Sequence, residues 1–339
     1  MVRVAMLSFW HVHAKDYARE AEEHPETEII AVWDEVPERG KMEADKRGVR
    51  FFPDLDELLA QPDIEGVIVD TPTTMHREVM VAAAKAGKHI FTEKVIAHTL
   101  RDSLAITSAV EEAGVKLTVS LRRLYNASTG AIKEILDMGL LGDITMVRVR
   151  DAHGGAVPNE KNPNGWLVAH FFNRAETAGG AMIDLGCHPM YLTRHFLGMP
   201  ESVSASYGHV TGREVDDNAV VTLRYANGAL GIVETGFVSS FAPFTIEVHG
   251  TAGSLVYSAT DGKIHIRSPH IEGASTQWLV KDVAAPEAPK AFAQWVTHIR
   301  QGTDDPENIT IGNDLSGLME ASNLSAAENR PVRLDELAR

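Results

Sequence analysis

The chain has 339 residues, which is enough for two domains that each bury a core of their own. Its formal net charge of −15 argues against a nucleic-acid partner, because such a partner requires a basic face. No apolar run approaches the length of a membrane span and no secretory leader is recognisable, so we expect no membrane partner. The single cysteine, Cys187, excludes an internal disulfide and fits a reducing compartment, so we expect a cytoplasmic protein.

In the first third of the sequence, short apolar runs alternate with stretches of helical periodicity. The runs are rich in Val and Ile and lack polar alternation, as is typical of parallel strands covered on both faces. The predicted strands span 3–7, 28–33, 66–70, 89–92 and 116–119, and the predicted helices span 14–23, 37–46, 55–59, 75–86 and 100–113. Asp54 can cap the third helix, and Gly114 stands where the fifth should end. The pattern predicts an α/β fold with a doubly wound parallel sheet that binds its ligand at the carboxyl ends of the strands.

The turn after the first strand has an unusual composition. In dinucleotide-binding sheets this turn carries G-x-G-x-x-G, whereas residues 8–12 read "SFWHV" and include no glycine. We expect weaker contact with a pyrophosphate, offset by the Ser8 hydroxyl and by a ring nitrogen of His11 or His13. In the alternative, Phe9 and Trp10 only pack and both histidines are solvated.

Asp34 ends the second predicted strand. A carboxylate at this position accepts hydrogen bonds from the adenosine ribose and repels a 2′-phosphate, so Asp34 favours NAD over NADP. In the alternative, Asp34 only begins the turn that leads to Pro37.

Two later stretches contain motifs with characteristic spacing. The first, residues 67–99, contains Thr71-Pro72, His76, A-G-K-H at 86–89 and Thr92-Glu93-Lys94. The second, "AGGAMIDLGCHPMYLTRHFLG" at 178–198, contains Gly179, Gly180, Asp184, Gly186 and His188. Through these motifs the chain resembles the glucose–fructose oxidoreductase / inositol dehydrogenase (Gfo/Idh/MocA) family, whose patterns are T-P-x-x-x-H, A-G-K-H, E-K-P and G-G-x-x-x-D-x-G-x-H. The resemblance runs over most of the chain.

The resemblance implies a Rossmann-like first domain and an NAD(P)-dependent oxidoreductase that acts on a hydroxyl of a sugar, cyclitol or related polyol. It implies that Lys94, Asp184 and His188 are the catalytic group. The residues expected to bind the cofactor are Ser8, Phe9, Trp10, His11, His13, Asp34, Thr71, Pro72, His76, Glu93 and Lys94. The residues expected to bind the substrate are Arg123, Trp166, His170 and Tyr191.

The chemistry of the three catalytic candidates supports these roles. Oxidation of a secondary alcohol needs a base for the hydroxyl proton while hydride leaves to the nicotinamide, and His188 can serve near neutral pH. Asp184 lies four residues before His188, so on one helix the two side chains would share a face. The Lys94 ammonium would stabilise alkoxide character on the substrate oxygen. We expect the three groups, contributed by two domains, to converge beside the nicotinamide.

The chain departs from the family pattern at two of these motifs. Val95 replaces the proline of E-K-P. A cis peptide bond before a residue other than proline costs about 2.5–4 kcal/mol. We therefore predict a trans Lys94–Val95 peptide, or else an evidently strained one. Tyr191 stands where many members have a second acid, which predicts a different contact with a substrate hydroxyl.

The pattern changes beyond residue 121, so we predict a dinucleotide-binding domain over 1–121 and a substrate-binding and oligomerisation domain over 122–339. The expected elements are helices over 127–138 and 315–328 and strands over 144–151, 202–209, 219–225, 229–237, 244–249 and 254–258. Hairpin signals at Asn227-Gly228 and Asp261-Gly262 predict a mostly antiparallel sheet in an α+β domain. Family members commonly pair one face of such a sheet between subunits, so we expect a homodimer or homotetramer.

Three other functions compete with the dehydrogenase. One is a cofactor-bound sensor or regulator without turnover, and another is a glycosidase that uses bound NAD for transient oxidation. The third is a metal enzyme, suggested by His11-x-His13 and by the set Asp184, His188 and His195. We expect no metal, because the H-x-H pattern often occurs by chance and because His195 lies two helical turns beyond His188, too far to share an ion with it. We also expect Cys187 to be a buried packing residue.

Overall fold

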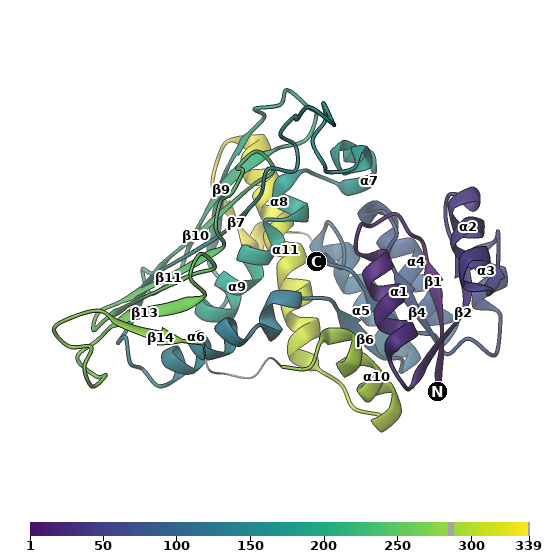
Figure 1. Ribbon diagram of the computed structural model, residues 1–339, viewed down its shortest axis with the longest axis horizontal. Helices are drawn as coiled ribbons and strands as arrows, with labels where there is room; N and C mark the ends of the chain where they lie inside the picture. Colours follow the sequence, from purple (N-terminus) through teal and green to yellow (C-terminus); the bar gives the residue numbers. More distant parts are fainter. Residues whose placement is uncertain (284–287, 338–339) are drawn as a thin grey trace. The chain divides into compact units, whose positions relative to one another are not determined.

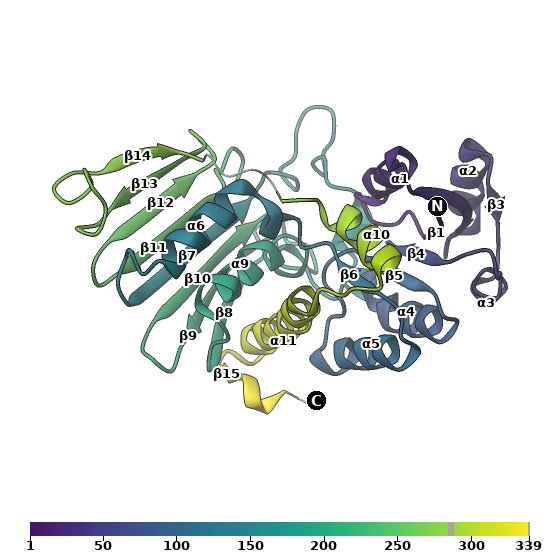
Figure 2. The same ribbon diagram turned by 90° about the horizontal axis from the view of Figure 1, so that it is seen from below.

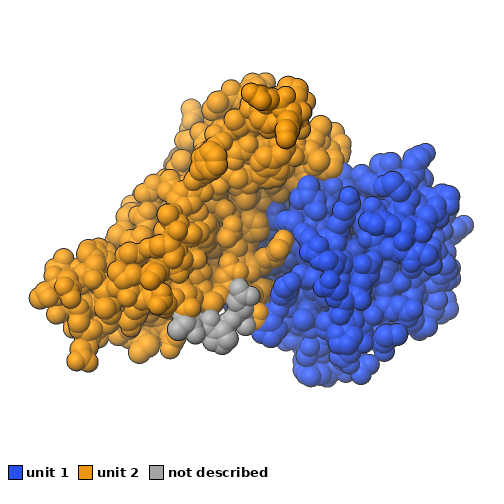
Figure 3. Space-filling view, viewed as in Figure 1, with its two compact units in different colours: residues 1–121, 289–316, 339 blue, residues 122–288, 317–338 orange. Residues whose placement is uncertain are grey.

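The computed structural model describes residues 1–283 and 288–337. The chain folds into two compact units, coloured separately in Figure 3. The first unit comprises residues 1–121 and 289–316, and the second comprises residues 122–288 and 317–338. The predicted division at residue 121 coincides with the first change of unit, but that prediction placed every later residue in the second domain. The chain returns to the first unit for residues 289–316.

The first unit contains a parallel sheet with the strand order β3-β2-β1-β4-β5-β6. Its strands are β1 (Val2–Leu7), β2 (Thr27–Trp33), β3 (Arg50–Phe51), β4 (Gly66–Val69), β5 (His89–Thr92) and β6 (Leu117–Val119). β1 and β4 are almost entirely buried, as their continuous apolar composition predicts. The predicted Rossmann-like fold is therefore confirmed. The short strand β3 was not predicted, because two residues carry no readable periodicity.

Helices cover both faces of this sheet. They are α1 (Ala14–Glu23), α2 (Pro37–Arg47), α3 (Leu55–Leu59), α4 (His76–Lys85), α5 (Leu100–Ala113), α10 (Ala291–Gln301) and the first part of α11 (Pro306–Glu328), with a 3₁₀ turn, η1, over Thr73–Met75. Helices α1 and α10 lie over one face and α4 and α5 over the other (Figure 2). Asp54 caps α3 through the Glu57 N–H, and Gly114 ends α5 in the left-handed conformation, as predicted.

Aromatic packing and amide bonds explain why residues 289–316 return to the first unit. In α10, the rings of Phe292 and Trp295 pack against Phe91 of β5, with centroids 5.4 and 5.9 Å apart. In α11, the Asn308 side chain accepts from the Val119 N–H and donates to the Val119 carbonyl at the end of β6. These pairings link residues about 190 to 200 positions apart, so sequence periodicity gives no signal for them.

The second unit is built on a mostly antiparallel sheet with the order β14-β13-β12-β11-β7-β10-β9-β8-β15, in which β7 and β10 pair in parallel. Its strands are β7 (Ile144–Ala152), β8 (Ser202–Gly208), β9 (Asn218–Arg224), β10 (Leu230–Gly236), β11 (Thr245–Gly250), β12 (Ser254–Ser258), β13 (Lys263–Arg267), β14 (Leu279–Asp282) and β15 (Val332–Arg333). The predicted α+β character is confirmed, and the Asn227-Gly228 hairpin joins β9 to β10 with Gly228 at φ 85°. Strands β13 to β15 were not predicted.

Helices lie on one side of this sheet (Figures 1 and 2). The unit's helices are α6 (Ala127–Asp137), α7 (Arg174–Thr177), α8 (Ala181–Asp184), α9 (Cys187–Leu197) and the last part of α11, with 3₁₀ turns over Arg122–Tyr125, Ala169–Phe172 and Leu334–Glu336. Helix α9 packs on β7 and β10, and β9 alternates exposed and buried residues along its whole length. The sheet therefore has one covered face and one open face. Within the described residues, no helix is both long and apolar enough to cross a bilayer.

Candidate functional site

The turn after β1 adopts a backbone conformation normally left to glycine. Ser8 has φ 79°, at the position where a glycine-rich turn would begin. The backbone N–H groups of this turn bind within the protein: that of Phe9 donates to Asp34 Oδ2 (2.9 Å), that of Trp10 to Ser8 Oγ (3.0 Å) and that of His11 to the Asp70 carbonyl (3.1 Å). These three donors are therefore already used, and a ligand at this turn would depend mainly on side chains.

The rings of Phe9 and Trp10 are buried, so part of the packing alternative describes them correctly. The two histidines are not simply solvated, however, although His13 is only half-buried. His11 is buried, and His13 Nδ1 lies 3.3 Å from Oε1 of the buried Glu93. The two imidazole rings are neighbours, with centroids 4.8 Å apart.

Asp34 is buried at the end of β2, and four donors use its carboxylate. Arg39 donates twice, from Nε to Oδ2 (2.8 Å) and from Nη2 to Oδ1 (2.7 Å), and the Phe9 and Val36 backbone N–H groups complete the set. A carboxylate has about four acceptor sites, so Asp34 in this arrangement organises the turn and Arg39. The neighbouring Glu35 binds Arg39 Nη2 through Oε1 (2.5 Å). Burial raises the pKa of Glu35, and the nearby Ser8 hydroxyl partly offsets this.

Glu93 and Lys94, which follow β5, are both buried, and Lys94 Nζ lies 3.7 Å from Glu93 Oε1. The Tyr17 hydroxyl donates to the other oxygen of Glu93, Oε2. Burial raises the pKa of Glu93, but the opposing effects of His11, His13 and the Lys94 ammonium outweigh it and hold the pKa well below its usual range. Glu93 is therefore a fixed negative charge beside two imidazoles and an ammonium.

The peptide between Lys94 and Val95 is cis, so the expectation of a trans bond was wrong. That expectation used the local preference of the bond alone, whereas this segment is held by buried tertiary contacts. His76 Nδ1 lies 2.9 Å from the Val95 carbonyl oxygen, and its Nε2 lies 3.2 Å from that of Thr71. His76 thus connects the segments after β4 and β5, and burial lowers its pKa. Thr71 and Pro72 are buried beside it.

Asp184 and His188 do not lie on one continuous helix, contrary to the spacing argument. Asp184 ends α8 and His188 is the second residue of α9. Gly186 stands between the two helices, where a Cβ would lie 2.7 Å from the Met182 carbonyl oxygen. This close approach explains the glycine of the motif and breaks the helical register. Cys187 is buried, as predicted, and its thiol donates to the Asp184 carbonyl.

His188 is held by Tyr191, one helical turn further along α9. The Tyr191 hydroxyl lies 3.0 Å from His188 Nδ1 and accepts a hydrogen bond from the Arg123 N–H (2.9 Å). Tyr191 is wholly buried. Tyr191 therefore fixes the orientation of the His188 imidazole, a group that can take a proton from a substrate hydroxyl.

The other predicted substrate residues also belong to the second unit. The Arg123 guanidinium forms an ion pair with Asp151 (2.5 Å) and stacks over Phe244, with Cζ 4.0 Å from the ring centroid. Trp166 is 60% exposed, and its ring centroid lies 4.7 Å from that of His153. His170 lies in the 3₁₀ turn over Ala169–Phe172, beside the ring of Phe171.

His153 also interacts with the acidic residues of this unit. Burial lowers its pKa, and the charges of Asp184 and Asp151 partly offset this. Its ring stacks on Phe237, with centroids 5.2 Å apart and planes 11° from parallel. His153 thus places an imidazole within electrostatic reach of two carboxylates.

Comparisons with known proteins match both units. A model described as an oxidoreductase family with an NAD-binding Rossmann fold matches residues 4–121, and one for the GFO/IDH/MocA C-terminal domain matches residues 129–256. The chain belongs to the Gfo/Idh/MocA family. It is an NAD(P)-dependent oxidoreductase that acts on CH–OH groups, as are its sugar and cyclitol dehydrogenase relatives.

Three relatives illustrate the range of this Gfo/Idh/MocA group. The chain is 31% identical to a 1,5-anhydro-D-fructose reductase of Ensifer adhaerens over 233 residues, which cover 68% of each chain. It is 27% identical to an NADP⁺-dependent scyllo-inositol 2-dehydrogenase of Bacillus subtilis (strain 168), over 84% of this chain and 85% of that one. In fold it resembles a levoglucosan dehydrogenase solved with NADH and L-sorbose, with a TM-score of 0.82, 21% identity and coverage of 98% and 99% of the two chains.

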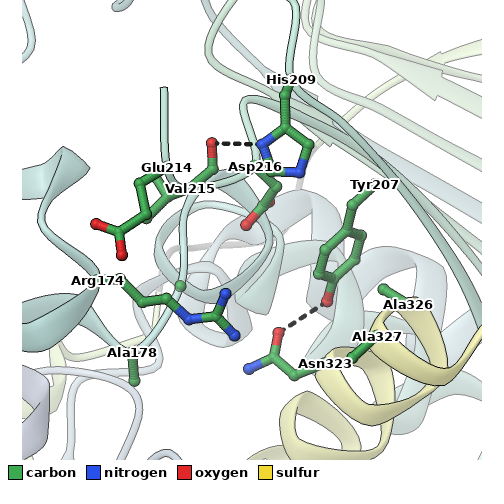
Figure 4. A pocket seen from close by; sticks show the side chains of 11 residues that line it. Arg174, Ala178, Tyr207, His209, Glu214, Val215, Asp216, Asn323, Ala326 and Ala327 are labelled. Atoms are coloured by element: carbon green, nitrogen blue, oxygen red, sulfur yellow. Dashed lines mark hydrogen bonds between the residues drawn. The ribbon is translucent and has the colours of Figure 1, made fainter. Parts of the chain in front are cut away.

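The residues that line a separate pocket of about 190 Å³ support the G-G-x-x-x-D segment of the family motif (Figure 4). One wall contains Asp216, whose carboxylate accepts from the Gly180 N–H (2.8 Å) and the Met182 N–H (2.7 Å) at the start of α8. A Cβ on Gly180 would lie 1.9 Å from the Asp216 carbonyl oxygen, which explains this glycine. Tyr207 also lines the pocket and donates to Asn323 Oδ1. The pocket residues thus fix the start of the helix that carries Asp184.

Several residues that organise this Gfo/Idh/MocA site were missed by sequence reasoning. Arg39 and Glu35 follow Asp34 closely in a polar helix start, where they resemble solvated residues. Tyr17 occupies a core position of α1 and is recognisable only through its contact with Glu93. Asp70 was assigned to the end of a strand, but its buried carboxylate follows β4. Only the tertiary structure shows that each of these residues contacts, or lies electrostatically near, a predicted one.

Proposed function

We propose that the protein oxidises a secondary hydroxyl of a sugar or cyclitol, or reduces the matching ketone, with Lys94, Asp184 and His188 as the catalytic group. The observation that carries this proposal is the bond between His188 Nδ1 and the buried Tyr191 hydroxyl, because it holds the imidazole of the proposed base in one orientation. Lys94 supports it from the first unit as a buried ammonium at the carboxyl end of the parallel sheet.

Each catalytic candidate has one task in this reaction. The bound nicotinamide supplies the hydride chemistry. The His188 imidazole takes the hydroxyl proton, and Tyr191 keeps this imidazole oriented. The Lys94 ammonium stabilises negative charge on the substrate oxygen, which is most valuable in a site shielded from water. Asp184 binds a substrate hydroxyl or orients the base.

We propose NAD rather than NADP as the cofactor. Asp34 and Glu35 place two carboxylates against one guanidinium, Arg39, at the end of β2. This excess of negative charge disfavours a 2′-phosphate. Within the described residues, Glu35 Oε2 is buried and has no hydrogen-bond partner that meets normal geometry, so Glu35 has an acceptor to offer a ribose hydroxyl. The other cofactor residues, among them Ser8, Thr71, Pro72 and His76, border the same ends of β1 and β4.

The first experiment is a fluorescence titration of the purified protein with NADH and with NADPH. A panel of sugars, anhydrosugars and inositols then follows, with NADH absorbance as the readout. Lys94→Ala and His188→Ala should each lower kcat/KM by about 10²–10⁴-fold. Lys41→Ala and His298→Gln are matched controls on α2 and α10 and should retain activity. Unchanged turnover in the first two variants would refute the assigned roles, and tight cofactor binding without turnover of any substrate would favour the sensor function.

We further propose that the open face of the antiparallel sheet pairs with a second copy of the chain. Val220 and Leu230 are 45% and 41% exposed on β9 and β10. Arg148 of β7 forms ion pairs with Glu234 and Glu247 on the neighbouring strands. Such a mixture of apolar and self-complementary charged groups suits a homo-oligomer interface. Light scattering should show a dimer or tetramer, and a monomer at micromolar concentration would contradict the proposal.

A further inference from the structure

Three adjacent strands of the first unit end in side chains that can bind a metal ion. His11 and His13 follow β1, Asp70 follows β4 and Glu93 follows β5, and β1, β4 and β5 are neighbours in the sheet. One ligand atom from each of His11, His13 and Glu93 lies within 4.8 Å of the others. These three residues form a compact group of two imidazoles and a carboxylate, which we call the His–His–Glu cluster.

The geometry of the His–His–Glu cluster is close to what a tetrahedral ion needs. Zinc binds nitrogen and oxygen ligands at about 2.0–2.2 Å, so neighbouring ligand atoms lie about 3.3–3.5 Å apart. His13 Nδ1 and Glu93 Oε1 already lie 3.3 Å apart. His11 has to move by about an ångström, and binding through its Nδ1 has to displace the 3.2 Å bond from the His13 backbone N–H.

The Glu93 carboxylate is oriented in the way that metal-binding carboxylates usually are. The Tyr17 hydroxyl donates to Oε2, and its oxygen lies 2.6 Å from Ser120 Oγ. This support fixes one oxygen of Glu93 and directs the other, Oε1, toward His13. Hydrogen-bonded partners of this kind hold metal ligands in place and set their basicity.

Asp70, whose backbone carbonyl accepts from the His11 N–H, supplies a second, independent observation. Its carboxyl group is wholly buried, and within the described residues neither of its oxygens has a hydrogen-bond partner. A buried acid without a partner is costly unless it is neutralised or paired. An ion in the cluster would add positive charge near this carboxyl group.

We propose that His11, His13 and Glu93 bind a divalent transition-metal ion, of which zinc best suits two imidazoles and one carboxylate. The Lys94 ammonium, 3.7 Å from Glu93 Oε1, competes with the ion for this oxygen. The ion would add positive charge at a turn whose N–H groups of Phe9, Trp10 and His11 are already used. The metal site itself does not depend on the proposed function. Only the consequence that the ion's charge would face the pyrophosphate of a bound dinucleotide rests on that function.

Cobalt(II) titration of the full-length protein tests the site. The protein is first treated with a chelator and dialysed, and Co²⁺ binding is then followed by calorimetry and by visible absorption. We expect one ion per chain and a tetrahedral absorption band that Zn²⁺ removes. His11→Gln and His13→Gln should each weaken Co²⁺ binding by at least about 100-fold, and Tyr17→Phe by about tenfold, because it removes only a supporting bond.

His298→Gln is the matched control, since it removes an imidazole from α10 of the same unit and should leave Co²⁺ affinity unchanged. Circular dichroism of each variant distinguishes a lost ligand from a lost fold. The absence of a Co²⁺ band in the folded wild type would overturn the proposal, as would unchanged affinity in both folded histidine variants. A separate NADH titration tests the dehydrogenase, so a protein that binds Co²⁺ but no dinucleotide would retain this site and lose the proposed function.

Discussion

Replacing Tyr191 by Phe tests whether this residue positions the proposed base. The substitution removes one oxygen and keeps the ring, so the packing of the wholly buried side chain is preserved. The lost oxygen accepts from the Arg123 N–H at 2.9 Å and lies 3.0 Å from His188 Nδ1. Both partners are then left in a buried region without this hydrogen bond.

The structure sets the size of both expected effects. A buried hydrogen bond contributes about 0.5–1.5 kcal/mol, so the loss of two should lower the free energy of unfolding by about 1–3 kcal/mol. General base catalysis supplies about 10²–10⁴-fold in rate. Because His188 remains present and only its orientation and tautomer are released, Tyr191→Phe should lower kcat/KM by a smaller factor, about 10–100-fold.

The assay combines a pH profile of kcat/KM with urea denaturation. Because Tyr191 contacts the imidazole at His188 Nδ1, its loss should shift the pH profile of kcat/KM. Tyr225→Phe is the matched control: Tyr225 is also buried in the second unit, but its hydroxyl has no hydrogen-bond partner within the described residues. It should change neither rate nor profile. A destabilised Tyr191→Phe variant with unaltered kcat/KM and pH profile would refute the positioning role.

Three further predictions follow from the site. Gly180→Ala should destabilise the second unit by about 1–3 kcal/mol or more, because its Cβ would overlap the Asp216 carbonyl. The control Gly130→Ala, in open space on α6, should stabilise the protein by about 0.5–1 kcal/mol. Equal denaturation midpoints for the two variants would contradict this. His153 has a lowered pKa in the folded protein, so its ionisation does not affect stability at high pH and destabilises the fold as the pH falls below 6.5. His153→Gln should therefore reduce the loss of unfolding free energy below pH 6.5 by up to about 1.4 kcal/mol per pH unit. An identical pH dependence of the unfolding free energy in the two proteins would contradict this. Glu35→Gln should raise the affinity for NADPH relative to NADH about tenfold, and an unchanged ratio would remove Glu35 from cofactor selection.

The sequence alone was sufficient for the alternating elements of the first unit, apart from the two-residue strand β3. Buried parallel strands are continuous apolar runs, and local signals such as Asp54 and Gly114 mark where helices begin and end. The family motifs also identified the reaction class, because the residue types and their spacing are local properties of the chain. The return of residues 289–316 to the first unit was beyond such reasoning, since Phe292 and Trp295 select their partners through packing.

At the candidate site, sequence identified the residues and tertiary structure decided their partners. The spacing of Asp184 and His188 suggested one helix, but the close backbone approach at Gly186 divides it. The acid at Asp34 was predicted, but its pairing with Arg39 was not, and the bond between His188 and Tyr191 became visible only in the fold. The physical reason is that propensity and motif spacing act along the chain. Hydrogen-bond pairing, burial and the resulting pKa shifts depend instead on which distant segments fold against one another.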